Sequence, residues 1–287
     1  MNRKGFLQTA VTMAGGSLLA STPTKLLANP PFAMSELGIK IPEYLKPGDR
    51  IGICSPAGYI TLDELQPALQ RIEEWGFTTK IGDSIGQRDF CFGGTDEVRA
   101  ADLQQLLDAT DIKAILCARG GYGLVRIIDH LDFTLFQKNP KWLIGFSDIT
   151  VLHEHLNQRI HVASIHSKMC NSFVKDRSTE TAEQRRSIES IRDCLLGKKM
   201  EYQAMPSLDN RLGISSGQLI GGNLKTIEST CGSKSDIQTA GKILFVEDTG
   251  EYLYSIDRMF WNLKRSGKLD KLAGLIIGGF KIKPDAP

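Results

Sequence analysis

Short apolar runs that alternate with helical stretches constrain the fold of this chain more than any other feature. The runs lie at residues 50–54, 114–118 and 142–146, and helical stretches follow at 62–75 and 123–130. A short apolar run bounded by turn residues predicts a buried strand, and apolar side chains three and four residues apart predict an amphipathic helix. Strands that alternate with helices indicate an α/β fold with a parallel sheet covered on both faces.

The chain of 287 residues is long enough for two modest domains. We expect a flavodoxin-like N-terminal α/β domain over residues 44–170. A charged connector follows over residues 171–215 and contains one helix, at 180–196. A smaller C-terminal α/β domain takes residues 216–287 and stops directly after the apolar run 275–280. We therefore expect this domain to be incomplete, the apolar run to be uncovered, and the natural protein to continue past Pro287.

Composition excludes several classes of function. The chain is 41% hydrophobic and 24% charged, as in ordinary globular proteins, and its net charge of +2 gives no electrostatic case for a nucleic-acid partner. No apolar run reaches the ~20 residues of an integral membrane span. The six cysteines form no C-x-x-C pair, so we expect no metal and no cofactor. The sequence leaves open whether the protein forms a homodimer.

The first 33 residues are typical of a targeting segment and not of a fold. Basic residues at positions 3 and 4 precede an uncharged stretch at 9–20, and small residues and prolines follow at 21–31. This layout predicts an export signal and a periplasmic or exported protein. The start resembles a twin-arginine signal, although Lys4 stands where the second arginine belongs. The alternatives are a cytoplasmic tail and an amphipathic N-terminal helix.

Ser147 lies on a predicted strand-to-helix turn, in Gly145-Phe146-Ser147-Asp148-Ile149. Such a turn holds a serine hydroxyl out of the sheet, which is the geometry of a nucleophile elbow. Ile149 replaces the second glycine of the usual G-x-S-x-G pattern. The alternative is that Ser147 or Asp148 caps the following helix.

A second turn is rich in glycine, with Arg119-Gly120-Gly121-Tyr122-Gly123 following the run 114–118. Glycines leave backbone N–H groups accessible, and at the carboxyl end of a strand these groups can hold an oxyanion. The alternative is a plain tight turn. If the two strands are neighbours, both turns line one crevice at the carboxyl ends of a parallel sheet, where such sheets bind ligands.

Four motifs occur in an order that resembles a known family. They are R-G-G-Y-G at 119–123, G-F-S-D-I-T at 145–150, G-G-N-L at 221–224 and F-V-E-D-T-G-E at 245–251. The series resembles the LD-carboxypeptidases, serine peptidases that trim murein peptides, and their microcin-immunity-type relatives, which cleave a peptidyl-nucleotide antibiotic. The resemblance covers roughly residues 44–282.

The resemblance implies a catalytic arrangement. Ser147 is the nucleophile, and Glu247 is the acid that orients a histidine base. Glu247 follows the apolar run 242–246, so we expect it at the end of a strand; the alternative is that it pairs with Arg258 or Lys264.

The resemblance also implies residues that bind the substrate. The oxyanion donors are backbone N–H groups near Gly120 and Gly121 and at Asp148. Arg119 is a candidate for contact with the substrate carboxylate, or it braces the loop by pairing with Asp148.

The family's histidine base normally follows the acid, but all five histidines of this chain precede Glu247. His166 resembles a pocket-wall histidine, and we expect His153 and His155 at the surface or the edge of the core. The third catalytic residue is thus not among them, and we expect the chain ending at Pro287 to be inactive.

The expected function is hydrolysis of the L–D peptide bond that releases terminal D-alanine from murein tetrapeptides, with a murein peptide as the partner. One alternative is an immunity-type peptidase, in which Trp142 or Tyr122 stacks a base. A second alternative is a catalytically inactive murein-binding relative. A third is a nucleotide-binding protein, but the sequence lacks the phosphate-loop patterns of that class.

Overall fold

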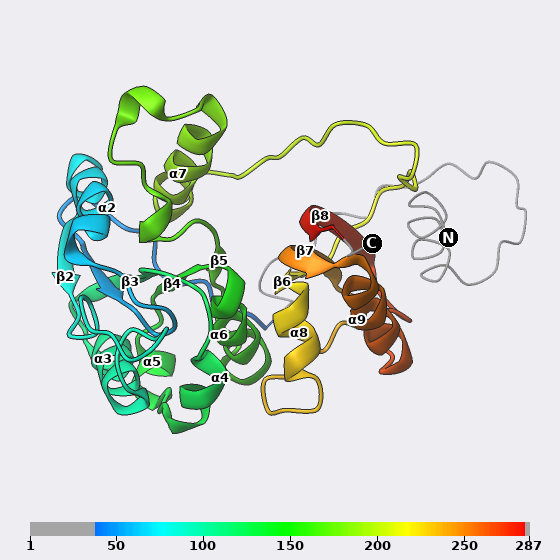
Figure 1. Cartoon of the computed structure of the whole chain (residues 1–287), viewed down its shortest axis with the longest axis horizontal. Coiled ribbons are helices and arrows are strands. Elements are labelled where there is room, and N and C mark those ends of the chain that lie inside the picture. Colours follow the sequence, from blue (N-terminus) through cyan, green and yellow to red (C-terminus); the bar gives the residue numbers. More distant parts are fainter. Residues whose placement is uncertain (1–37, 285–287) are drawn as a thin grey trace, which may run out of the picture. The chain divides into compact units, whose positions relative to one another are not determined.

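The computed structural model describes residues 38–284, which form two compact units (Figure 1). The N-terminal unit takes residues 39–201 and 232–236, and the C-terminal unit takes residues 202–231 and the chain from 237 onward. The predicted export signal lies outside the described residues. Within residues 38–284, no helix has the length and apolar character that a bilayer crossing requires.

The N-terminal unit contains a five-stranded sheet in which every pair is parallel. Its strands are β1 Arg50–Cys54, β2 Thr78–Ile81, β3 Ile112–Cys117, β4 Trp142–Gly145 and β5 Ile165–His166. The strand order β2-β1-β3-β4-β5 is that of the flavodoxin-like doubly wound fold. The predicted fold class is therefore confirmed.

Six α-helices of this unit are α2 Leu62–Glu74, α3 Asp96–Asp108, α4 Leu124–Ile127, α5 Thr134–Lys138, α6 Thr150–His155 and α7 Ala182–Leu195. Helix α2 begins at Thr61, whose side chain accepts from the Glu64 N–H in a capping box. Helix α4 is shorter than the stretch predicted at 123–130, because a 3₁₀ turn, Ile128–His130, replaces its end. A π-helical turn, Leu156–Ile160, continues α6.

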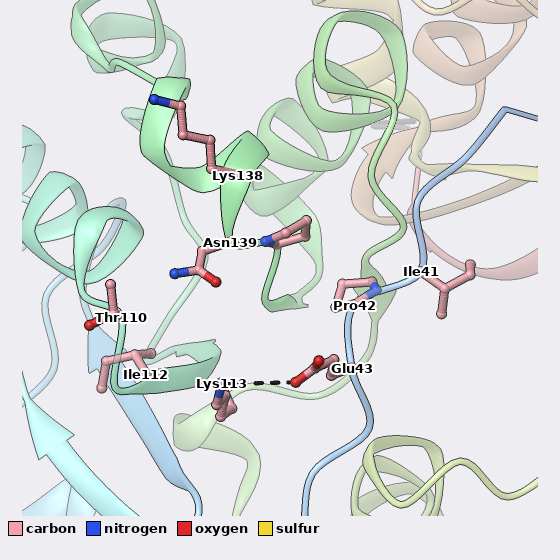
Figure 2. A pocket seen from close by; sticks show the side chains of 9 residues that line it. Ile41, Pro42, Glu43, Thr110, Ile112, Lys113, Lys138 and Asn139 are labelled. Atoms are coloured by element: carbon pink, nitrogen blue, oxygen red, sulfur yellow. Dashed lines mark ion pairs between the residues drawn. The ribbon is translucent and has the colours of Figure 1, made fainter.

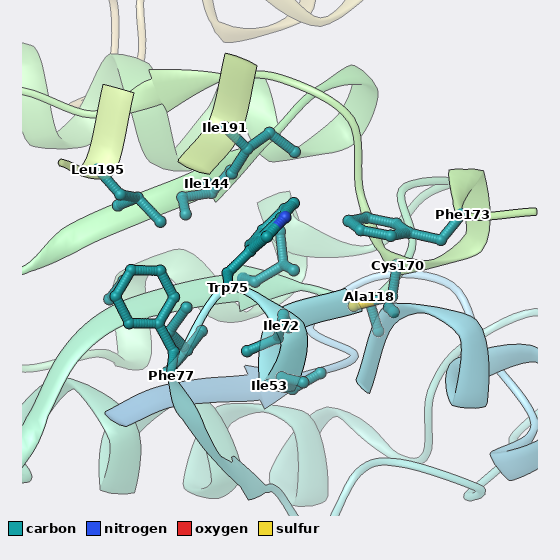
Figure 3. Close-up of a cluster of buried hydrophobic side chains, with 14 of the residues drawn as sticks. Ile53, Ile72, Trp75, Phe77, Ala118, Ile144, Cys170, Phe173, Ile191 and Leu195 are labelled. Carbon is teal, nitrogen blue, oxygen red and sulfur yellow. The ribbon is translucent and has the colours of Figure 1, made fainter. Parts of the chain in front are cut away.

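The two faces of the sheet pack into two separate cores, because successive strand residues point to opposite sides. On β3, Ala114 and Leu116 face the core formed with α2 and α7. Ile115 and Cys117 face the core formed with α3, α4, α5 and α6. Figure 3 shows the first core, with Trp75 between the sheet and α7.

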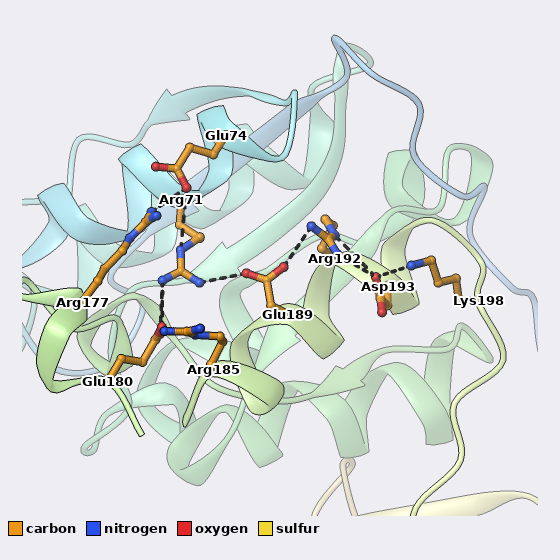
Figure 4. Close-up of polar contacts among 9 residues, drawn as sticks. All are labelled: Arg71, Glu74, Arg177, Glu180, Arg185, Glu189, Arg192, Asp193 and Lys198. Atoms are coloured by element: carbon orange, nitrogen blue, oxygen red, sulfur yellow. Dashed lines mark hydrogen bonds and ion pairs between the residues drawn. The ribbon is translucent and has the colours of Figure 1, made fainter. Parts of the chain in front are cut away.

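The compact unit extends beyond the boundary predicted at residue 170. Ile188, Ile191 and Leu195 of α7 are at most 2% exposed and pack into the first core (Figure 3). The sequence predicts a connector over residues 171–215 because this segment is rich in charged residues. Much of the charge forms an ion-pair network on α7 and α2 (Figure 4), in which Arg71 pairs with Glu180 at 3.1 Å and Glu189 at 2.8 Å.

A short segment from later in the chain also belongs to the N-terminal unit. Residues 232–236 follow helix α8, Leu224–Thr230, of the C-terminal unit, yet they belong to the first unit. Ser235 Oγ lies 3.0 Å from His155 Nδ1, and Lys234 pairs with Asp129 at 3.3 Å. This segment therefore contacts α6 and the 3₁₀ turn that follows α4.

The C-terminal unit contains a parallel three-stranded sheet in the order β6-β7-β8. Its elements are β6 Leu219–Asn223, α8 Leu224–Thr230, β7 Ile243–Tyr252, α9 Leu253–Arg265 and β8 Gly274–Lys283. The expectation that Glu247 ends a strand is wrong. Strand β7 continues to Tyr252, and its pairing with β8 shifts register between Val246 and Asp248.

Strand β8, at the edge of this sheet, is only partly covered. Ile276 and Ile277 on β8 are 50% and 41% exposed, as expected for an uncovered strand. Leu275 and Phe280 instead pack partly against the core around Leu244 and α9. The predicted exposure thus applies to two of the four apolar residues of that run.

Candidate active site

Ser147 lies on a strained strand-to-helix turn at the carboxyl end of β4. Its φ angle is 62°, in the left-handed region that side chains other than glycine rarely adopt. The residue before it is extended, and Ser147–Ile149 forms a 3₁₀ turn that leads into α6. A left-handed residue of this kind costs about 1–2 kcal/mol, and such strain concentrates at functional sites. This is the projecting geometry that a serine nucleophile needs.

Gly145 makes this sharp turn possible. A Cβ atom at this position would lie 2.8 Å from two side-chain carbons of Ile149, which is too close for any other residue. The Gly145 carbonyl accepts two hydrogen bonds, from the Ser167 N–H at 3.0 Å and from His153 Nε2 at 2.9 Å. The start of the elbow is therefore held from two sides.

His153 is a buried support of the elbow, and the expectation that it lies at the surface or core edge is wrong. It is 7% exposed, and its Nδ1 lies 2.8 Å from Ser164 Oγ. Because the Gly145 carbonyl can only accept, Nε2 carries the proton and Nδ1 accepts from the serine hydroxyl. Burial lowers the pKa of His153 to about 4, so the ring is neutral at pH 7. His155 is also buried, at 8% exposed.

The glycine turn meets the elbow, as the neighbouring strands predict. A Cβ atom at Gly120 would lie 3.0 Å from Ser147 Cβ and 3.2 Å from Ser147 Oγ. Gly121 has a φ of 111°, and the Gly120 carbonyl accepts from the Gly58 N–H at 2.8 Å. Neither the Gly120 nor the Gly121 N–H donates to a backbone carbonyl within residues 38–284. These two donors can serve an oxyanion beside Ser147.

Asp148 connects the elbow to the glycine turn. Its buried carboxylate accepts from the Leu124 N–H at 2.9 Å, at the start of α4. Burial raises the pKa of Asp148, and the hydrogen bond from Leu124 opposes that shift. The alternative that Ser147 or Asp148 caps the helix after it is therefore wrong, since neither the 3₁₀ turn nor α6 has a side-chain cap and Asp148 instead accepts from α4. Its backbone N–H remains the predicted oxyanion donor.

Arg119 does not pair with Asp148. Its guanidinium lies 3.5 Å from Glu64 Oε1 and 5.7 Å from the centre of the Tyr59 ring. The capping box holds Glu64 in place, since Glu64 Oε2 accepts from the Thr61 N–H at 2.9 Å. The predicted bracing by Asp148 is therefore wrong, and contact of Arg119 with a substrate carboxylate stays a prediction.

Sequence reasoning missed Arg99, which is fully buried beside these turns. Its guanidinium donates to the carbonyls of Pro56 at 2.6 Å and Gly123 at 3.1 Å, and it pairs with Asp96. It therefore ties the loop after β1 to the glycine turn after β3. An arginine on the inner face of a predicted helix was the available signal.

Glu247 belongs to the C-terminal unit and pairs in register with Asn223 of the G-G-N-L motif. The next residue, Asp248, is buried and accepts from Asn223 Nδ2 at 3.1 Å and from the Lys225 N–H at 2.9 Å. Burial raises the pKa of Asp248. The predicted alternative partners lie over aromatic rings, Arg258 over Tyr254 and Lys264 over Trp261.

Comparison with known proteins agrees with this geometry. The LD-carboxypeptidase N-terminal domain profile matches residues 51–167, and the LD-carboxypeptidase C-terminal domain profile matches residues 216–286. The chain belongs to the LD-carboxypeptidase family. Its members are serine peptidases, which agrees with a serine on the elbow.

Two relatives and one further solved structure illustrate the likeness. A probable murein peptide carboxypeptidase of Bacillus subtilis is 34% identical over 241 residues, 83% of this chain and 74% of that protein. The crystal structure of muramoyltetrapeptide carboxypeptidase from Oxalobacter formigenes has a TM-score of 0.70 at 28% identity, covering 82% of this chain and 78% of that one. The microcin C7 self immunity protein MccF has a TM-score of 0.72 at 23% identity, covering 86% and 83%, and shows the fold alone.

Two histidines of this LD-carboxypeptidase family member bind partners other than Ser147. His153 contacts Ser164 Oγ and the Gly145 carbonyl, and His155 contacts Ser235 Oγ. His166 pairs in register with Gly145, and burial lowers its pKa to about 3. No group of three or more metal-ligating side chains occurs in the described part of the chain.

A pocket lies elsewhere in the N-terminal unit, at the amino ends of β3 and β4 (Figure 2). It has a volume of about 260 Å³ and is lined by residues 41–43, 110, 112–113 and 138–140. Lys113 and Glu43 pair across it at 4.0 Å. Ser147 follows the carboxyl end of β4, so this pocket is not part of the catalytic crevice.

Proposed function

We propose that this protein is a serine carboxypeptidase that hydrolyses the L–D peptide bond and releases terminal D-alanine from murein tetrapeptides. The observation that carries the proposal is Ser147, held at a φ of 62° with Gly120 packed against its side chain. The names of the relatives supply the substrate class, since they act on murein peptides and muramoyltetrapeptides.

The geometry supports acyl transfer through Ser147. The Ser147 Oγ attacks the carbonyl carbon before the terminal D-alanine while a base takes its proton. The oxyanion of the tetrahedral intermediate accepts from backbone N–H groups at Gly120, Gly121 and Asp148. The C–N bond then breaks, the protonated base gives its proton to the leaving amine, and water hydrolyses the acyl-enzyme by the same steps.

Neither His153 nor His166 is suited to take the proton of Ser147, and Glu247 is the candidate for the acid that orients the base. His153 Nε2 is committed to the Gly145 carbonyl, and the pKa values of His153 and His166, about 4 and 3, make both poor proton acceptors at pH 7.

The test is Ser147→Ala in the protein at its natural length, with D-alanine release from a murein tetrapeptide as the readout. We expect a loss of at least about 10³-fold in kcat, with unchanged circular dichroism. Ser207→Ala, at an exposed serine, is the matched control and should keep full activity. Activity of Ser147→Ala within tenfold of the wild type would contradict the proposal.

A second candidate substrate is a peptidyl-nucleotide, which needs an exposed aromatic ring for stacking. Trp142 cannot supply it, since it is 5% exposed at the amino end of β4 and donates to the Glu43 carbonyl at 3.0 Å. Tyr122 in the glycine turn is 52% exposed and fits this role better. Faster hydrolysis of a peptidyl-adenylate than of the tetrapeptide, lost in Tyr122→Ala, would favour this candidate.

We also propose that the protein is exported. The basic start and the uncharged stretch at 9–20 support this proposal. N-terminal sequencing of protein recovered from the cell envelope should give a start between roughly residues 20 and 34. An intact Met1 on active cytosolic protein would contradict it.

A further inference from the structure

Lys168 places a positive charge next to the elbow. It is exposed, and its ammonium lies 5.3 Å from the centre of the Phe146 ring, the residue that directly precedes Ser147. No carboxylate of residues 38–284 forms an ion pair with it. A cation over an aromatic face is attracted by the ring, which favours this position of the side chain.

The backbone on both sides of Lys168 is fixed to the catalytic turns. The Ser167 N–H donates to the Gly145 carbonyl at 3.0 Å. Met169 is buried, and its Cε would lie 3.1 Å from a Cβ atom at Gly120. The lysine therefore projects from a segment that is held against the elbow and the glycine turn, although its own side chain is exposed.

Arg119, the other cation near the turns, is already engaged. Glu64 lies 3.5 Å from its guanidinium and is itself fixed by the capping box at Thr61. Binding a substrate carboxylate at Arg119 would compete with this pair. Lys168 has no such competitor among the described residues.

We propose that Lys168 binds the terminal carboxylate of the D-amino acid that leaves, and so makes the enzyme a carboxypeptidase. This rests on the function proposed above. Only the amide nitrogen and one α-carbon separate that carboxylate from the carbonyl carbon attacked by Ser147. When the carbonyl is at Ser147 Oγ, the terminal carboxylate must therefore lie beside the elbow, where Lys168 stands. A carboxylate on the side chain of the preceding diamino acid is several bonds further away.

The test measures binding in the natural-length protein carrying Ser147→Ala, so that nothing turns over. Isothermal titration calorimetry compares a murein tetrapeptide with a free terminal carboxylate and the same peptide as its C-terminal amide. Lys168→Met should weaken binding of the free acid about tenfold or more and leave the amide within about twofold, since a charge-assisted hydrogen bond is lost only with the acid. Lys168→Arg should keep most of the preference.

Lys138→Met, at an exposed lysine beside the pocket at the other end of the sheet, is the matched control and should change neither affinity. Equal weakening of both peptides by Lys168→Met, or no weakening, overturns the role of Lys168. If Arg119→Met weakens binding of the free-acid peptide alone and Lys168→Met does not, the terminal carboxylate binds Arg119 instead. If the Ser147→Ala protein binds neither peptide, the proposed function fails and this inference with it.

Discussion

The two units share one arrangement beside their predicted catalytic residues, a buried aspartate that accepts a hydrogen bond from a neighbouring helix. An aspartate directly follows each one: Asp148 follows Ser147, and Asp248 follows Glu247. Each carboxylate is buried and accepts, at 2.9 Å, a backbone N–H from the first turn of the helix that follows the neighbouring strand. In both units, therefore, a buried carboxylate joins the strand that carries the predicted catalytic residue to the glycine-containing turn beside it.

The units differ in what the preceding residue does. Ser147 leaves the sheet with a φ of 62°, whereas Glu247 stays in β7, in register with Asn223. A nucleophile must project toward the substrate, which requires a strained turn. An acid that orients another side chain only needs to be held in place, and an extended strand does this without strain. Four measurements can break or sharpen this comparison.

The largest difference should lie in the cores. Ile53 in β1 is fully buried, and Ile53→Ala should lower the free energy of unfolding by about 2–5 kcal/mol, since it removes buried methyl groups and leaves a cavity. Ile277 in β8 is 41% exposed, and Ile277→Ala should cost less than about 1 kcal/mol. Urea unfolding measures both. Equal losses would show that β8 is covered in solution.

Acid should destabilise the N-terminal unit selectively, because all five histidines lie in it. Burial holds the pKa of His153 near 4, below the ordinary value of 6.5, so the unfolded chain binds the proton first. The stability from this group is present above pH 6.5 and is lost as the pH falls toward 4, by roughly 3 kcal/mol.

Hydrogen exchange of the two units between pH 7 and pH 4 measures this loss, and His153→Gln should reduce it. His130→Gln, at an exposed histidine, is the control and should leave the pH profile unchanged. An equal loss of protection in both units would mean that groups other than the histidines cause the acid sensitivity.

The two aspartates should contribute about equally to stability. Asp148→Ala and Asp248→Ala each leave backbone N–H groups without their charged acceptor, at a cost of about 2 kcal/mol. The Asn variants keep an acceptor oxygen and should cost less, because burial raises the pKa of both carboxyl groups and so disfavours their charge. Asp270→Ala, at an exposed site, should stay within about 0.5 kcal/mol of the wild type. If one aspartate proves neutral, the parallel between the units does not hold.

The smallest effect concerns strain at Ser147. Ser147→Gly should be more stable than Ser147→Ala by about 1 kcal/mol, because only glycine adopts a positive φ without steric cost. At Ser187 inside α7 the order should reverse, with Gly less stable than Ala by about 1 kcal/mol. If the Ala variant is the more stable one at both positions, the backbone at Ser147 is not strained.

What the sequence predicts well is local. The strands β3 and β4 and the turns after them follow from apolar runs and glycines, and parallel pairing of neighbouring strands then brings Gly120 to Ser147. The contacts of Asp148, Arg99 and His153 depend on segments that approach one another only in the folded chain, so no spacing encodes them. The sequence predicts the helix α7, but its charged surface gives no sign that three of its apolar residues complete a core.

The segment 232–236 has a consequence for synthesis on the ribosome. The N-terminal domain of a nascent chain folds while later residues are still being added, at about 5–20 residues per second. All five strands of the first sheet are available once residue 201 has emerged, but Ser235, the partner of His155, arrives only after β6 and α8. For a few seconds during synthesis, the N-terminal unit is therefore folded before the ribosome has added Ser235, which completes its contact with His155.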